Sequence, residues 1–298
     1  MSPSKVRGYQ FMFRKRLVAT VAATPLLLFA SGAFAETTIA DTRTAGVSTA
    51  TINNGAPDDI RITAAGKVKP TAGGAAGNIA GAVTINSNHD VINEGEISAE
   101  NVSYIAGVKV NAGAVGDVTN KATINLSSTL ELKDTDNDGD LDGPFADGTN
   151  KFGILVQGAM TGNILNDTAG SISIKGNESV GILVQGPLTG NLTSRGAINV
   201  TGDDARGIYL AAPVTGNVSI SGSVTALGEN SLAVETGDIS GRLTVQGTIV
   251  SRGFRYASRP PAAEDRVKLD ADDKLLGSSA LVVAGNVGGG ILLDAAPV

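Results

Sequence analysis

A repeat of about 26 residues is the feature that most constrains how this chain can fold. Three consecutive segments share the pattern Gly-Ile-[Leu/Tyr]-[Val/Leu], four variable residues, then Thr-Gly-Asn and an aliphatic residue. They begin at Gly153, Gly181 and Gly207, which are 28 and 26 residues apart. Weaker copies begin at Gly81, Gly107, Ala233 and near Ala280. Repetition of whole units predicts a fold in which each unit stacks on its neighbours.

The apolar residues inside each unit predict short strands. In the second copy, Ile182 and Val184 alternate with other residues, and so do Ile198 and Val200. Alternation with a period of two indicates half-buried strands, and the Gly, Asn, Asp and Ser residues between them indicate corners. No helical stripe interrupts the repeats. We therefore predict an all-β fold, a right-handed parallel β-helix (β-solenoid) of about seven rungs, with a β-sandwich as the alternative that strict repetition disfavours.

The composition agrees with a β-solenoid of narrow cross-section. The chain of 298 residues contains 39 glycines, no Trp and only 4% aromatic residues, so its core must consist of small aliphatic side chains. Gly and Asn both tolerate a positive φ, so the same bend can recur in register at the Thr-Gly-Asn corners. The absence of Cys and the presence of a single His exclude disulfides, a thiolate nucleophile and multi-histidine metal sites.

Residues 1–35 have the order of a secretory signal peptide. Five basic residues precede the apolar run from Leu17 to Ala30, and Ala33 and Ala35 form an A-x-A cleavage site. We expect the Sec export machinery to recognise this segment and cleavage to follow Ala35. Residues 36–298 then form one β-solenoid domain with 18 basic and 29 acidic residues, a net charge of −11. Such an acidic protein is a poor partner for nucleic acid.

Two intervals between copies, 46 and 47 residues, exceed the period by the length of one loop. They predict inserts at about 127–150 and 254–277. The first contains aspartates at alternate positions around glycines, as in Ca²⁺-binding loops: Asp134, Asp136, Asp138, Asp140 and Asp142. Position 12 of this segment is Phe145 instead of Glu, so it is not an EF-hand. The alternatives are a weak calcium site and a solvated acidic loop; no other cofactor is expected.

The second insert contains a segment from Pro261 to Gly277 that fits a short helix. Val267, Ala271 and Leu275 would share one face and lie on the rod as a helical cap. The part of the insert that precedes this segment contains Arg255, Tyr256 and Arg259. These side chains could together contact an anionic or sugar ligand, although basic residues in an exposed loop commonly have no such role.

Signatures of catalysis are weak. His89 precedes Asp90, but no activated-serine motif accompanies them, and we expect a histidine in a surface turn. The pairs Asp58-Asp59 and Asp203-Asp204 are adjacent in sequence, so their side chains diverge or cap turns instead of facing each other across a sugar. We therefore predict a non-enzymatic protein and keep a β-helical polysaccharide lyase or hydrolase as the alternative.

The signal peptide, the glycine-rich rungs, and the segments Arg252-Gly-Phe-Arg-Tyr and Val283-Ala-Gly-Asn-Val-Gly-Gly-Gly resemble the N-terminal passenger regions of bacterial autotransporters. The resemblance covers about residues 46–298. It implies type V secretion, a C-terminal outer-membrane barrel, and a passenger displayed at the cell surface or secreted, often adhesive.

No barrel follows in this sequence, which stops in an apolar rung at Val298. We expect the passenger to be incomplete at its C-terminus and its function to be structural or adhesin-like, with an unknown surface ligand. A truncated remnant without function is a third possibility.

Overall fold

The computed structural model describes residues 36–135, 141–253 and 261–295. Phe34–Val298 form one compact unit, and the description below concerns that unit. The predicted signal peptide, Asp136, Asp138 and Asp140 of the predicted calcium loop, and the predicted contact residues Arg255, Tyr256 and Arg259 lie outside the described residues.

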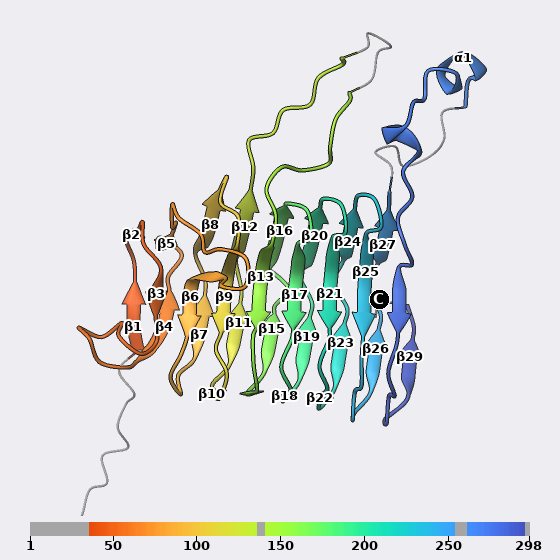
Figure 1. Ribbon diagram of the computed structural model, residues 1–298. Helices are drawn as coiled ribbons and strands as arrows, with labels where there is room; N and C mark the ends of the chain where they lie inside the picture. The colour runs from red at the N-terminus through yellow and green to blue at the C-terminus, as the bar shows by residue number, and fades with distance from the viewer. Residues whose placement is uncertain (1–35, 136–140, 254–260, 296–298) are drawn as a thin grey trace, which may run out of the picture. The chain divides into compact units, whose positions relative to one another are not determined.

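Three long sheets form the sides of the stack, and each rung gives one strand to each of them (Figure 1). Sheet A contains β1 (Glu36–Ile39), β4 (Asp59–Ile62), β7 (Val91–Asn93), β11 (Val118–Asn120), β15 (Ile164–Asn166), β19 (Leu192–Ser194), β23 (Val218–Ile220), β26 (Leu243–Val245) and β29 (Ile291–Leu293). Sheet B contains β2 (Thr42–Arg43), β5 (Lys67–Val68), β8 (Glu96–Glu100), β12 (Thr123–Ser127), β16 (Ser171–Lys175), β20 (Ala197–Thr201), β24 (Val224–Leu227) and β27 (Ile249–Arg252). Sheet C contains β3 (Val47–Ser48), β6 (Ala80–Ile85), β9 (Ile105–Val110), β13 (Lys151–Val156), β17 (Val180–Val184), β21 (Arg206–Leu210), β25 (Leu232–Thr236) and β28 (Leu281–Val283).

The register of these sheets confirms the predicted parallel β-solenoid. Neighbouring strands are parallel, and equivalent repeat positions face each other: Ile154 pairs with Ile182, and Ile182 with Ile208. A fourth, narrow sheet that the sequence did not predict lies between sheets C and A. It consists of two-residue strands, β10 (Ala114–Val115), β14 (Met160–Thr161), β18 (Leu188–Thr189) and β22 (Val214–Thr215). Rungs also begin earlier than the recognisable copies, because β1 to β5 already occupy their places in sheets A, B and C.

The prediction of half-buried strands is wrong for two strands in the middle of sheet C, β13 and β17. All six residues of β13 and all five of β17 are buried. Their inward side chains belong to the central core, while outward side chains form a second cluster in which Phe152, Leu155 and Leu183 are buried. Tyr209 packs against this outer cluster. Burial on both faces explains why these strands read as the continuous apolar run Ile-Leu-Val.

At the recurring Thr-Gly-Asn corners, the glycine is the residue that adopts a positive φ. Gly190 has a φ of +150°, and a side chain there would meet the backbone of the preceding rung. The asparagines do not adopt a positive φ. Instead Asn163 Oδ1 accepts a hydrogen bond from the backbone N–H of Asn191, and Asn191 Oδ1 accepts one from Asn217. These corner asparagines therefore form an exposed ladder that links one rung to the next.

The predicted helical cap is also wrong. In its described part, residues 261–277, the second insert contains a four-residue helix, α1 (Ala263–Arg266), and a 3-10 turn at Asp272–Lys274. The Asp270 carboxylate accepts a hydrogen bond from the Asp272 backbone N–H, a local bond that competes with helix continuation. Val267 is 84% exposed, so the expected apolar face does not form. No helix in the described part of the chain is long and apolar enough to cross a membrane.

Candidate functional site

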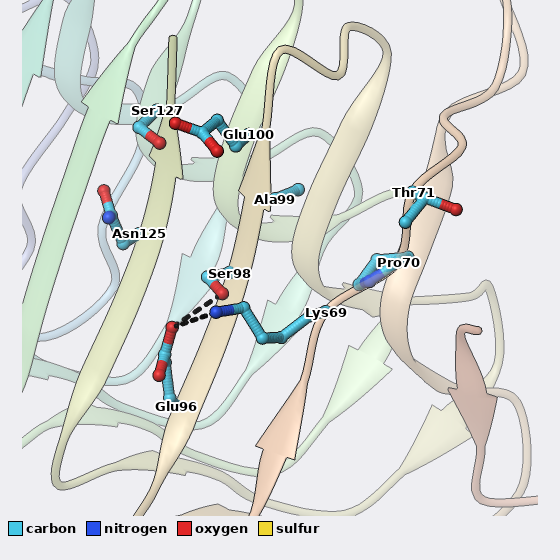
Figure 2. A pocket seen from close by; sticks show the side chains of 9 residues that line it. All are labelled: Lys69, Pro70, Thr71, Glu96, Ser98, Ala99, Glu100, Asn125 and Ser127. Atoms are coloured by element: carbon cyan, nitrogen blue, oxygen red, sulfur yellow. Dashed lines mark hydrogen bonds and ion pairs between the residues drawn. The ribbon is translucent and has the colours of Figure 1, made fainter. Parts of the chain in front are cut away.

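A polar groove of about 400 Å³ lies on the outer face of sheet B (Figure 2). Its lining residues come from three successive rungs: Lys69, Pro70 and Thr71 after β5; Glu96, Ser98, Ala99 and Glu100 in β8; and Asn125 and Ser127 in β12. None of them is aromatic, and most end in hydroxyl, amide, carboxylate or ammonium groups. The groove is therefore suited to a hydrogen-bonding ligand.

The groove exists because β5 is shorter than its neighbour. β8 pairs with β12 along all five of its residues but with β5 only at Lys67 and Val68. The chain then reaches Pro70, which has no N–H to continue a ladder. After Ile97, the edge of β8 that faces β5 consequently has no paired strand. The outward side chains of this part of β8 line the groove.

Glu96 is the residue in this groove whose pKa is shifted most from its ordinary value. Its carboxylate lies 3.0 Å from Lys67 Nζ, accepts a hydrogen bond of 2.8 Å from Ser98 Oγ, and lies 3.2 Å from Lys69 Nζ. These contacts, led by the one with Lys67, hold the pKa of Glu96 at about 2. A carboxyl group with this pKa stays ionised at neutral pH and cannot serve as a general acid.

At the end of the groove away from Glu96, the side chains have fewer partners within the protein. Glu100 and Ser127 lie near its upper end in Figure 2, and the described part of the chain gives the Glu100 carboxylate no ion pair. Asn125 projects from β12 into the same hollow. Residues four apart on one strand lie roughly 13 Å apart, so Glu96 and Glu100 are too widely separated for the paired carboxylates of a glycosidase. This end offers binding groups without a catalytic pair.

The two inserts leave the stack at the same corner, between sheets B and C (Figure 1). The first joins β12 to β13 and the second joins β27 to β28. β27 lies four places from β12 in sheet B, about 19 Å along the stack at the usual strand spacing. The inserts nevertheless meet, because the Gly143 backbone N–H donates a 2.9 Å hydrogen bond to Asp272 Oδ2.

Acidic side chains from both inserts gather at this meeting point. Carboxylate oxygens of Asp142, Asp270 and Asp272 lie within 4.8 Å of one another, a separation that suits a hard cation. The hydrogen bond with Asp272 raises the pKa of Asp270. Of the predicted calcium ligands, Asp134 and Asp142 lie in the described chain, and Asp142 also accepts a hydrogen bond from Thr135 Oγ1. Calcium binding by the Asp134–Asp142 loop stays a prediction.

A buried lysine closes the corner where the first insert departs. In later rungs a glycine N–H bridges to the next rung at this corner, as Gly176 N–H does to the Thr201 carbonyl. The first insert removes the equivalent donor, and the Lys151 ammonium replaces it. Lys151 is fully buried, and its Nζ donates to the carbonyls of Lys175 at 2.7 Å and Ser127 at 2.8 Å. Burial lowers the pKa of Lys151.

Replacing Lys151 with methionine should leave the Lys175 carbonyl unpaired and lower the free energy of unfolding by about 2 kcal/mol. The pH dependence should also change. The pKa of Lys151 is lower in the folded protein than in the unfolded chain, where it is about 10.4. Between these two values the unfolded chain binds more protons than the folded protein, so the stability of the wild type rises with pH. Urea unfolding at several pH values should show this rise in the wild type and not in Lys151→Met. An unaltered rise in the variant would contradict this assignment; the control is Lys121→Met, which removes a half-buried lysine that pairs with Glu94 at the surface.

The other residues considered for catalysis have structural partners. His89 Nδ1 lies 3.0 Å from Ser87 Oγ, whereas Asp90 Oδ1 accepts the Asp117 backbone N–H at 2.7 Å. The serine and the aspartate are thus not joined through the imidazole. The carboxylate of Asp59 accepts the Asp90 N–H, and that of Asp203 accepts the Glu229 N–H. These two carboxylates therefore accept backbone N–H groups of the next rung and link neighbouring rungs.

The sequence analysis missed two groups of functional interest. It did not anticipate that Asp270 and Asp272 would join the acidic cluster, or that a groove would open beside Glu96. No family model matches the chain, and the searches of curated proteins and of solved structures found no significant similarity.

Proposed function

We propose that this protein is a non-enzymatic β-solenoid, exported through its N-terminal segment, that acts in adhesion or display at the cell surface as part of an autotransporter passenger. The observation that supports a binding role most directly is the state of Glu96. The carboxylate of Glu96 in the groove on sheet B is held ionised by Lys67 and Lys69, which suits ligand contact and not proton transfer.

The placement of the variable segments supports the same role. Regular rungs supply a stiff support, while the segments that break the repeat leave it at a single corner. Binding residues are commonly carried on loops that a rigid scaffold positions. The export part of the proposal depends on residues 1–35, which have the order of a secretory signal peptide and lie outside the described residues.

A comparison of binding with turnover tests this function. The chain from Glu36 to Val298, which lies within one compact unit, should bind to cell surfaces or immobilised polysaccharides and release no reducing sugars from acidic polysaccharides. Replacing Glu100 by Gln and Asn125 by Ala should weaken that binding at least tenfold.

The matched control for the groove is Asn199→Ala. Asn199 projects from the same face of sheet B, two strands from Asn125, and does not line the groove. Release of reducing sugars would favour the carbohydrate-active enzyme instead. Absence of binding to every surface tested would favour a remnant without function. Equal losses of binding in the groove variant and in Asn199→Ala would exclude the groove as the contact site.

A further inference from the structure

Strand β8 leaves part of its backbone without a partner. The Glu96 N–H donates to the carbonyl of Gly66, just before β5, and the Asn101 N–H donates to the Ser127 carbonyl of β12. Alternate residues of a strand direct their backbone groups to the same neighbour. The even-numbered residues of β8 therefore face β5, and the odd-numbered ones face β12.

The ladder between β8 and β5 stops at the Ser98 carbonyl. Val68 pairs with Ile97, and continuing this register puts the nitrogen of Pro70 where the donor to that carbonyl would lie. Proline has no N–H. In the described part of the chain no group bonds to the Ser98 carbonyl, and none bonds to the backbone N–H or carbonyl of Glu100. Ser98 is only 7% exposed, so its carbonyl also has little access to bulk water.

The groove on sheet B occupies the place of the missing strand. Figure 2 shows Lys69 beside β8, whereas Pro70 and Thr71 lead away from it, and these residues line one side of the groove of about 400 Å³. The edge of β8 on the other side offers an acceptor, a donor and an acceptor in succession. This alternation matches the main chain of an extended peptide, and strand addition to an open edge is a recurrent way of binding one.

The side chains beside this edge favour a basic residue in the peptide. None of the ion pairs of the described chain involves Glu100, whereas the Glu96 carboxylate is held by Lys67 and Lys69. Residues that lie opposite each other on neighbouring strands project from the same face, where opposite charges attract. A lysine or arginine opposite Glu100 would therefore form an ion pair.

We propose that β8 binds a short extended segment of another protein as an added parallel strand, with a lysine or arginine opposite Glu100. The segment takes the place that β5 vacates. Its N–H groups donate to the carbonyls of Ser98 and Glu100, and one of its carbonyls accepts the Glu100 N–H. This inference rests on the proposed binding function and names the class of ligand that the groove takes.

A synthetic peptide tests the ligand class. Acetyl-Thr-Ala-Lys-Ala-Thr-amide should bind saturably to the chain from Glu36 to Val298 in calorimetry. Alanines flank the lysine because these residues would face inward beside Ala99, which is only 4% exposed. In the parallel pairing the alanine N–H groups donate to β8, so methylation of both alanine nitrogens should weaken binding at least tenfold. Exchange of the peptide lysine for glutamate should do the same.

Variants of Glu100 separate the charge from the backbone. Glu100→Gln should weaken binding of the lysine peptide severalfold, and Glu100→Pro, which also removes the N–H, at least tenfold. The proline costs no bond to β12, because the even-numbered residues of β8 face the other way. The matched control Glu229→Gln should bind normally, since Glu229 is exposed and does not line the groove. Circular dichroism should show that all three variants stay folded.

Hydrogen exchange followed by NMR locates the contact. The Glu100 amide should exchange quickly in the free protein and slowly with the peptide, whereas the Glu96 amide, already bonded to the Gly66 carbonyl, should not change. No saturable binding, equal binding of the methylated peptide, or an unchanged Glu100 amide would each overturn the proposal. If the chain binds polysaccharides and not the peptide, the proposed function stands and strand addition is rejected.

Discussion

Replacing Asn120 with alanine is expected to lower the free energy of unfolding by about 3 kcal/mol, because it breaks a buried hydrogen-bonded ladder and leaves a cavity. Asn93 Nδ2 donates to Asn120 Oδ1 at 2.8 Å, and Asn120 Nδ2 donates to Asn166 Oδ1 at 2.8 Å. All three side chains are buried inside sheet A. Alanine would leave the Asn166 oxygen without this donor and the Asn93 amide with a single acceptor, the Thr123 carbonyl.

The matched control is Asn191→Ala in the exposed corner ladder. Asn191 makes the same kinds of bond, donating to Asn163 Oδ1 and accepting from the Asn217 N–H, but water can replace them. Its loss should stay below about 1 kcal/mol. Urea unfolding followed by circular dichroism measures both variants. Equal losses would show that burial does not set the strength of the inner ladder.

Replacing Gly181 with alanine is expected to destabilise the protein by about 3 kcal/mol through steric overlap. A Cβ on Gly181 would lie 2.4 Å from Ile198 Cγ2 and 2.5 Å from the Gly207 carbonyl oxygen. The second contact is with backbone in the next rung, which cannot move without disturbing the pairing of β17 with β21. The requirement recurs at Gly153, whose Cβ would meet Ile172 and the Gly181 carbonyl.

Gly237→Ala provides the comparison for this prediction. Its nearest neighbour would be the Leu210 carbonyl oxygen at 3.1 Å, and its φ lies outside the left-handed region. The expected loss is within about 1 kcal/mol. Thermal or urea unfolding of both variants decides the matter. A Gly181→Ala protein as stable as Gly237→Ala would mean that the rungs separate readily to admit a methyl group.

Most of the architecture was predictable because the repeat states the register directly. Residues at equivalent places in successive copies, such as Ile182 and Ile208, pair across neighbouring strands. Period-two alternation separates inward from outward residues wherever one face is exposed, as in β16, where Ile172 and Ile174 are buried. The same rule failed in β13 and β17, since strands buried on both faces show no alternation.

The inner asparagine ladder was accessible in the sequence but concealed by the first insert. Asn93 and Asn120 are one period apart, at 27 residues, whereas Asn120 and Asn166 are 46 apart. Each ends a three-residue strand of sheet A, so aligning the rungs after removing the insert would have placed them in one column. The ladder ends where Asn166 faces Ser194, whose short side chain does not reach it.

The sequence by itself determined the rung, the positions of the two inserts and the small aliphatic core, because these depend on spacing within one period and between successive periods. Only the tertiary structure decided what lies between distant rungs. The structure shows that the inserts share a corner and meet through Gly143 and Asp272. It also shows that Lys151 replaces a missing N–H and that a groove opens beside Glu96. All three features depend on which strands end early and on where the chain leaves the stack. Periodicity carries no information about such departures, because they are the places where the period is broken.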